Sequence, residues 1–279
     1  MLETATHTSE IFAVSHQNNI QSASNIITAS LDLVSSSFDA IIDFKPDVIY
    51  HLAAMSSPEA CERSPDLAKA ITVGATGRLV ELANNLGCRL IFTSTDLVFD
   101  GENAPYNEFA KPSPINMYGK QKAVAEKIVL TTMPENGVIV RCPLMFGRSV
   151  HNRVNFTAGI IRKLRAREPV YLFTDEYRTP AWGRDVAALL WQIGASDSSG
   201  VFHAGGAERL SRFEMGEIIC AALNADRSLL IDSQRKDVNS SADRPRDCSL
   251  ESSRTNAELS LPGFCERLQQ LLSELEKHS

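Results

Sequence analysis

The sequence has 279 residues, a formal net charge of −6 at pH 7 and six cysteines. This length allows one large core, or one core with a smaller lobe packed on it. The dispersed Lys and Arg residues and the negative net charge argue against a partner with a phosphate backbone, so we expect no nucleic-acid binding. No segment is typical of a signal peptide or a membrane span, and the cysteines lack metal-ligand spacing. We therefore expect a cytoplasmic protein with no metal site and no membrane partner.

Strands and helices alternate in the first half of the sequence. We expect strands at 10–16, 47–54, 89–95 and from 137, a helix at 35–44 with serines available to cap it, a helix at 65–86 that ends at Gly87, and a helix from about 118. This alternation predicts an α/β fold with a parallel sheet covered on both faces and with right-handed crossovers.

Beyond Gly147 the alternation is looser. The patterns predict helices at 155–166, 184–195 and 210–225, a strand at 200–206 and an amphipathic C-terminal helix at 265–278. Ser211 and Glu214 have the spacing of a capping box. We therefore expect a first domain at 1–147 and, at 148–279, mainly a smaller α/β lobe that interleaves with the last strands of the sheet.

Tyr118 and Lys122 are the residues most indicative of chemistry. They stand four apart at the start of a predicted helix, so their side chains lie on one face and can share a reacting site. Thr95 ends the apolar run LIFTST, at the carboxyl end of a predicted strand, where open α/β sheets bind ligands. The three polar groups therefore converge on one crevice in acid/base geometry. The alternative is structural: a tyrosine exposed at a helix start, a solvated lysine and a strand-end threonine.

A series of motifs runs through most of the chain beyond about residue 25. These motifs are KPDVIYHLAA, STDLVFDG, PINMYGKQK, RCPLMFG, DEYRTPAWGRDVA, GVFHAGGAERLSRFEMG and ADRPRDCSLESSR. In them the sequence resembles the extended short-chain dehydrogenase/reductase superfamily, in the branch of dTDP-4-dehydrorhamnose reductase and of the regulatory beta subunit of methionine adenosyltransferase. The resemblance implies a Rossmann-type doubly wound parallel sheet with a smaller C-terminal substrate lobe.

The resemblance also implies catalytic roles. Tyr118 would protonate a carbonyl oxygen while a nicotinamide cofactor delivers hydride to its carbon. Lys122 would bind the cofactor ribose, and its charge would favour the phenolate of a tyrosine whose ordinary pKa is about 10. Thr95 would hold the carbonyl oxygen, and Asp96 beside it would contact the substrate. The implied catalytic residues are therefore Thr95, Tyr118 and Lys122.

Further residues match the family's contacts to the cofactor, NADP or NAD. Asp32 and Leu33 correspond to a pair beside the adenine, and small side chains after the second predicted strand allow a ligand to approach the backbone closely. The expected cofactor-binding residues are Asp32, Leu33, Ala53, Ala54, Met55, Thr93, Tyr118 and Lys122. Core packing is the alternative for the two alanines, and the sequence does not separate NADH from NADPH.

Two arginines match those that bind the pyrophosphate of a nucleotide-sugar. They are Arg178 in EYRTP and Arg244 in DRPRD, and a guanidinium fork suits such oxygens. With Thr95 and Asp96 they complete the expected substrate-binding set. The alternative is a surface ion-pair role, because carboxylates stand nearby at 175, 176, 243 and 247. The expected partner is a nucleotide-sugar, and a homodimer stays open.

The resemblance fails at the beginning of the chain. The family opens with a strand and a glycine-rich turn whose amides hold the cofactor pyrophosphate. Here the first glycine is Gly74. Residues 1–9 resemble the end of the first crossover helix, and the absent strand would lie in the middle of the sheet, where its loss leaves backbone groups unpaired.

Two explanations of this departure stay open. The sequence is an incomplete form of a reductase, begun at an internal methionine, or the protein has lost cofactor binding and keeps the fold for a regulatory role. The joint presence of Thr95, Tyr118 and Lys122 favours the first. The expected function is thus NAD(P)H-dependent reduction of a 4-keto nucleotide-sugar. The alternatives are a non-catalytic protein similar to the methionine adenosyltransferase beta subunit and an inactive truncated form.

Overall fold

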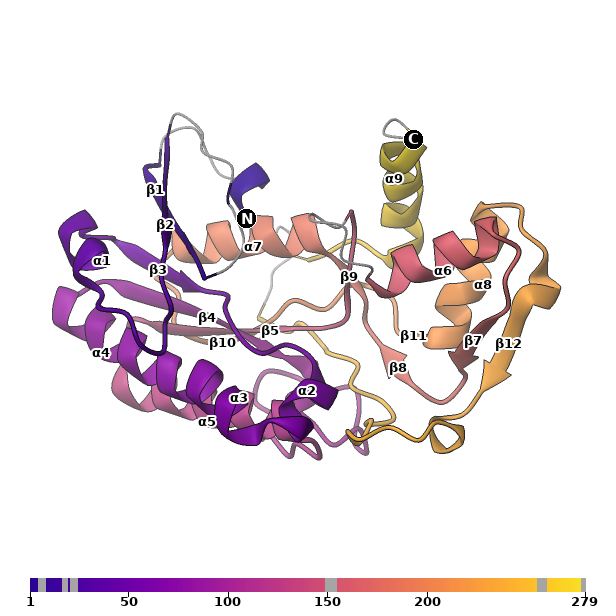
Figure 1. Cartoon of the computed structure of the whole chain (residues 1–279), viewed down its shortest axis with the longest axis horizontal. Helices are drawn as coiled ribbons and strands as arrows, with labels where there is room; N and C mark the ends of the chain where they lie inside the picture. The colour runs from indigo at the N-terminus through magenta and orange to yellow at the C-terminus, as the bar shows by residue number, and fades with distance from the viewer. Residues whose placement is uncertain (5–8, 17–19, 21–24, 149–154, 255–259, 277–279) are drawn as a thin grey trace.

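A four-stranded parallel sheet forms the centre of the first lobe in the computed structural model (Figure 1). The structure describes residues 1–4, 9–16, 20, 25–148, 155–254 and 260–276. The strands, in the spatial order β10-β5-β4-β3, are Val48–His51 (β3), Arg89–Thr95 (β4), Gly137–Cys142 (β5) and Gly200–His203 (β10). The α/β fold with a parallel sheet, predicted from the alternating pattern, is confirmed.

Helices cover both faces of this sheet (Figure 1). One face carries α1 (Asp39–Phe44), α2 (Pro58–Arg63), α3 (Pro65–Lys69), α4 (Ala75–Leu86) and α5 (Met117–Thr132), and the other carries α7 (Gly183–Gly194). Successive residues of a strand point to opposite faces. Leu90 and Phe92 therefore pack with α4 and α5, while Ile91 of the same strand packs with α7. Burial on both faces explains why this strand is a continuous apolar run.

The sheet is interrupted where the absent strand is expected. Strands β1 (Ile11–Ser15) and β2 (Ile26–Ser30) form a separate two-stranded parallel sheet, and neither pairs with β3. A cavity of about 570 Å³ lies between β1 and β3. Strand β2 was not predicted, because its residues do not alternate between apolar and polar and the residues around it are polar.

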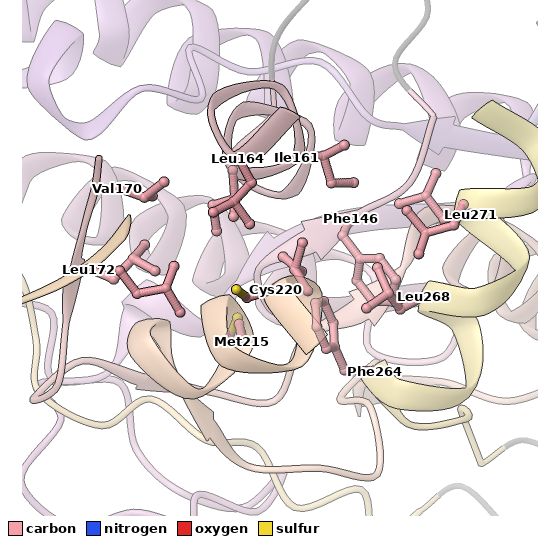
Figure 2. Packing of buried hydrophobic residues seen from close by; sticks show 14 of the residues in the cluster. Phe146, Ile161, Leu164, Val170, Leu172, Met215, Cys220, Phe264, Leu268 and Leu271 are labelled. Atoms are coloured by element: carbon pink, nitrogen blue, oxygen red, sulfur yellow. The ribbon is translucent and has the colours of Figure 1, made fainter. Parts of the chain in front are cut away.

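The second lobe packs helices around its own hydrophobic core. Its elements are β6 (Met145–Phe146), α6 (Phe156–Arg165), β7 (Val170–Phe173), β8 (Tyr177–Arg178), β9 (Ala181–Trp182), β11 (Leu210–Ser211), α8 (Arg212–Ala222), β12 (Leu230–Ser233) and α9 (Phe264–Glu276). Figure 2 shows the core, in which α6, α8 and α9 direct side chains such as Leu164, Met215 and Leu268 toward one another. Although they lie within residues 148–279, α7 and β10 belong to the first lobe.

Several predicted details can be compared with the structure. The capping box at Ser211 and Glu214 is confirmed, with both reciprocal hydrogen bonds present. The predicted serine cap of α1 is wrong, since Phe38 is the N-cap residue and caps no amide with its side chain. Ser35 and Ser36 hydrogen-bond Asp32 instead, because a turn aspartate competes for these hydroxyls.

Other predicted elements differ in extent. The predicted helix at 65–86 is continuous but contains a π-helical segment, Ala70–Gly74 (η2), between α3 and α4. At the N-terminus, Leu2–Thr4 (η1) is a 3-10 turn, and residues 5–8 of the predicted helix end lie outside the described residues, as does the end of the predicted C-terminal helix. Within the described ranges, no helix has the length and apolar character needed to cross a membrane.

The core of the second lobe predicts the effect of truncating Phe264. This side chain is fully buried and packs against Phe146, with ring centroids 4.7 Å apart. We expect Phe264→Ala to lower the free energy of unfolding by about 3–5 kcal/mol, because burial and ring contacts are both lost. Phe109→Ala is the matched control, since Phe109 is 81% exposed and its loss should change stability by less than about 0.5 kcal/mol. Denaturant titration of both variants measures the difference, and equal midpoints would contradict the packing.

Candidate functional site

The N-terminal end of α5 packs in close contact with the segment that follows β4. Asn116 is the N-cap residue, and its side-chain oxygen accepts a hydrogen bond from Gly119 N at 2.9 Å. A Cβ added at Gly119 would lie 2.0 Å from the carbonyl oxygen of Leu97, so only glycine allows this approach. The close contact places Tyr118 at the carboxyl end of the sheet, beside Thr95.

Thr95, Asp96 and Tyr118 meet at the carboxyl end of β4. Thr95 Oγ1 donates to Asp96 Oδ1 at 3.1 Å and accepts a hydrogen bond from Leu97 N at 3.2 Å. The phenol of Tyr118 lies within hydrogen-bonding reach of the Thr95 side chain. Burial raises the pKa of Tyr118 above its ordinary value, and the nearby charge of Asp96 adds a smaller effect in the same direction. The phenol is therefore protonated at neutral pH, which is the form that a general acid needs.

Lys122 lies on the same helix face but is directed at the strand. Its ammonium donates to the carbonyl oxygen of Thr93 at 2.7 Å and lies 4.3 Å from the ring centroid of Phe92. Burial lowers the pKa of Lys122 to about 8. The sequence analysis expected this cation to favour the phenolate of Tyr118, and that role stays a prediction; in this structure burial and Asp96 raise the pKa of the phenol.

The predicted cofactor-binding residues fall into two groups. Asp32, Leu33 and Ala53 line the cavity between β1 and β3, whereas Ala54 and Met55 follow in the irregular segment after β3 and do not line it. The Asp32 carboxylate accepts hydrogen bonds from Val34 N and the Ser35 hydroxyl, and these bonds lower its pKa. The second group, at the ends of β4 and α5, is Thr93, Tyr118 and Lys122.

An ion cluster joins the two lobes next to this site. Asp96 Oδ2 lies 3.2 Å from Arg178 Nε, and Glu176 lies 3.5 Å from Arg178 and 2.7 Å from Arg212. Burial raises the pKa of Asp96, although Arg178 opposes this effect. For Glu176 the arginines outweigh burial, and its pKa falls below its ordinary value. We call the group Asp96, Glu176, Arg178, Arg212 and Arg244 the interlobe ion cluster.

The two predicted substrate arginines differ in accessibility. Arg178 is buried, and its remaining donors reach the carbonyl oxygens of Tyr177 and Pro245. The side chain of Arg244 is 36% exposed and binds Glu59 at 2.6 Å. Arg178 does form the ion pair with Glu176 that the alternative offered, but the pair is buried and not on the surface.

Sequence reasoning gave no functional role to Glu176, Arg212 or Glu59. Glu176 was visible as a carboxylate beside Arg178, but its burial could not be read from that spacing. Arg212 is 36 residues from Glu176 and Glu59 is 185 residues from Arg244, so both pairs form only in the tertiary structure. Among the described residues, no group of His, Cys, Asp or Glu side chains could hold a metal ion.

The fold and the position of the site define the class of the protein. Helices cover both faces of a parallel sheet, and the polar groups gather at the carboxyl ends of its strands, as in Rossmann-type proteins. The chain belongs to the family described as RmlD substrate binding domain, whose model matches residues 5–277.

Proteins similar to this chain in sequence include methionine adenosyltransferase subunits and a probable reductase. Methionine adenosyltransferase 2 subunit beta of Rattus norvegicus is 34% identical over 223 residues, which are 77% of this chain and 65% of the rat protein. The chain thus covers less than two thirds of that relative. A probable low-salt glycan biosynthesis reductase, Agl14, of Haloferax volcanii is 30% identical over 220 residues, 78% of this chain and 73% of the relative.

Solved structures have the same fold. A dTDP-4-dehydrorhamnose reductase from Bacillus anthracis, in complex with NADP, superposes with a TM-score of 0.85 at 23% identity and covers 96% of this chain and 100% of its own. A hypothetical dTDP-4-dehydrorhamnose reductase from Sulfolobus tokodaii has a TM-score of 0.78 at 29% identity, covering 89% of this chain and 85% of its own. The family and these neighbours agree with the superfamily that the motifs indicated.

Because Arg178 pairs with two buried carboxylates of the interlobe ion cluster, we expect its removal to lower stability strongly. We expect Arg178→Met to lower the free energy of unfolding by about 3–5 kcal/mol, because Asp96 and Glu176 stay buried without this partner. Arg209→Met removes the same charge from an exposed pair with Asp247 and should cost about 0–1 kcal/mol. Denaturant titration compares the two variants. Similar losses would show that burial of the Arg178 pairs adds nothing.

Lys122 predicts a defined pH dependence of stability. Its folded pKa of about 8 lies below the unfolded value, so the unfolded chain binds more protons and the cost of burying Lys122 is relieved as pH rises above 8. We expect the stability of the wild type relative to Lys122→Met to increase by about 2 kcal/mol between pH 7 and pH 10. Denaturant titration of both proteins at both pH values measures this difference. The contributions of titratable groups that the two proteins share cancel in it. A constant difference would mean that the amine is not desolvated.

Proposed function

We propose that the protein is an NAD(P)H-dependent reductase of a 4-keto nucleotide-sugar, similar to dTDP-4-dehydrorhamnose reductase. The observation that carries this proposal is the meeting of Thr95, Tyr118 and Lys122 at the carboxyl end of β4. Family membership supports it, because reductase names occur both among the relatives and among the structural neighbours.

The roles of the chain's own groups follow from their geometry. Thr95 holds the substrate carbonyl oxygen, and the protonated phenol of Tyr118 donates a proton to that oxygen. Lys122 donates to the Thr93 carbonyl at the strand end and, with a cofactor bound, would also hold its ribose. The nicotinamide cofactor, when bound, supplies the hydride.

The residues present fit only the two ends of such a cofactor. Asp32, Leu33 and Ala53 offer small and polar contacts for the adenosine, and Tyr118 and Lys122 suit the nicotinamide riboside. No glycine-rich turn occurs before Gly74, and no Lys or Arg is among the residues that line the cavity. A dinucleotide pyrophosphate would therefore lack its usual amide donors.

For the substrate, Arg244 is the better candidate of the two arginines. It is partly exposed and its pairs with Glu59 and Glu176 can be exchanged for phosphate oxygens. To bind phosphate oxygens, Arg178 would have to release Asp96 and Glu176. Its proposed role therefore includes positioning Asp96 beside Thr95. Whether the working protein is a homodimer stays a prediction, which its mass in solution would decide.

A second candidate is a non-catalytic partner protein. It is favoured by the 34% identity to methionine adenosyltransferase 2 subunit beta and by the interrupted sheet. Cofactor binding alone does not separate the two candidates, because a regulatory protein of this fold can also bind a dinucleotide. Turnover does separate them, since only the reductase consumes NADPH or NADH with a 4-keto nucleotide-sugar.

The first test is a titration of the chain with NADPH and with NADH, followed by nicotinamide fluorescence and by thermal stability. Binding followed by turnover of dTDP-4-dehydrorhamnose supports the reductase. Binding without turnover, together with complex formation with a methionine adenosyltransferase catalytic subunit, supports the regulatory candidate. Absence of binding by both cofactors contradicts the proposal for residues 1–279.

Tyr118→Phe is the sharpest test of the proposed acid. Removing one hydroxyl group should lower kcat by at least about 100-fold and leave the cofactor Kd within about threefold, because only proton donation is lost. Tyr171→Phe is the matched control, since Tyr171 is 67% exposed on β7 and should keep full activity. Steady-state kinetics and cofactor titration measure both variants. Full turnover by Tyr118→Phe would exclude the assigned acid.

A further inference from the structure

The segment that carries Arg244 is fixed at the start of α5, next to Tyr118. Asn116 Nδ2 donates to Asp243 O at 3.0 Å, and the Arg235 guanidinium donates to the carbonyl oxygen of Arg244. Because two successive backbone carbonyls are bound, the backbone of Arg244 is held in place. Its long side chain is therefore the part that can exchange partners.

Helix α2 approaches the same place from the first lobe. Glu62 of α2 accepts a hydrogen bond from Met117 N at 2.7 Å, one residue before Tyr118. Glu59 stands one helical turn earlier, and its Oε1 lies 2.6 Å from Arg244 Nη2. The carboxylate of Glu59 thus reaches the guanidinium of Arg244 beside the proposed acid.

Glu59 is held toward Arg244 by the cap of its own helix. The Ser57 hydroxyl caps Ala60 N at 3.1 Å and also donates to Glu59 Oε2 at 3.2 Å. One carboxylate oxygen therefore faces Ser57 and the other faces Arg244. The side chains of Arg244 and Glu59 are 36% and 32% exposed, so water can solvate both when they separate. An ion pair at this exposure is weak and exchangeable.

The second carboxylate near Arg244 has closer partners of its own. Glu176 lies 3.7 Å from Arg244 Nη1, but 2.7 Å from Arg212 and 3.5 Å from Arg178. Its charge is therefore balanced without Arg244. Glu59 is the closer of the two carboxylates that hold Arg244, and its release frees one side of the guanidinium.

Two guanidinium groups beside Glu176 have donors to spare. Within the part of the chain that the structure describes, Arg212 Nη1 and Arg244 Nε are buried and have no hydrogen-bond partner. Buried donors without a partner are costly. An anion with several oxygens, such as a diphosphate, can therefore form bonds at Arg244 that the single carboxylate of Glu59 does not form.

We propose that Glu59 is an internal competitor for Arg244: it pairs with the guanidinium when the site is empty, and the diphosphate of a nucleoside diphosphate or nucleotide-sugar must displace it. The inference rests on the proposed function, because substrate phosphate is assigned to Arg244 there. It adds a residue of the first lobe that sets the affinity for the ligand without contacting the reacting atoms.

The experiment measures binding of dTDP to the whole chain by calorimetry at fixed ionic strength. The proteins are the wild type, Glu59→Gln, Arg244→Met and the double variant. Glutamine has the shape of glutamate and still accepts from Ser57, so only the charge is removed. Asp66→Asn is the matched control, because it removes one negative charge from an exposed position on the neighbouring helix α3.

We expect Glu59→Gln to lower the Kd of dTDP by at least about threefold and Arg244→Met to raise it by at least about tenfold. In the Arg244→Met background, Glu59→Gln should have no effect, because the competition needs the guanidinium. Asp66→Asn should leave the Kd unchanged.

Three results would overturn the competition. They are an unchanged Kd in Glu59→Gln, an equal gain in affinity in Asp66→Asn or in the Arg244→Met background, and a failure of dTDP to bind both the wild type and Glu59→Gln. A gain in these controls would mean that Glu59 acts only through the overall charge of the protein.

Turnover of dTDP-4-dehydrorhamnose with NADPH is measured separately, so the two proposals fail in different ways. Absence of turnover together with the expected changes in Kd contradicts the reductase and supports the competition. Turnover together with an unchanged Kd in Glu59→Gln supports the reductase and contradicts the competition.

Discussion

The buried contact between Asp96 and Arg178 is the interaction on which the site depends. Asp96 directly follows the central strand β4, and Arg178 belongs to the second lobe, so the pair joins the two lobes. The pair shapes the site chemically as well. The charge of Asp96 adds to burial in raising the pKa of Tyr118, and Arg178 moderates the pKa of Asp96 itself. The packing of the lobes and the pKa of Tyr118 are therefore coupled through one carboxylate.

Backbone pairing is the second constraint. The first lobe has the helices and crossovers of a doubly wound sheet, yet β1 and β2 stand apart from β3. The helices on both faces remain in place, so the interruption leaves a cavity lined by strand edges rather than a collapsed core. This explains how the proposed active site can be well formed at β4 and α5 although the described strands β1 and β2 stand apart from β3.

These two constraints bear on the choice between a reductase and a partner protein. The proposed catalytic end has a protonated phenol, a threonine within its reach and a buried ammonium that binds the strand end. At the other end, the sequence has no glycine before Gly74, and the described residues that line the cavity include no Lys or Arg. A reductase needs both ends, whereas a binding protein needs only the surface of the fold. The cavity between β1 and β3 thus bears on the function that the protein can perform.

The sequence by itself determined the strands β4 and β5, the capping box of α8 and the meeting of Thr95 with Tyr118, because each depends on local apolar runs, caps or helical spacing. It did not reveal β2, whose pairing with β1 is non-local, or the burial of Arg178. Only the tertiary structure decided that the pKa of Tyr118 is raised and that Lys122 binds Thr93. Desolvation and ion pairing depend on segments far apart in sequence, and local patterns carry no information about which of them come together.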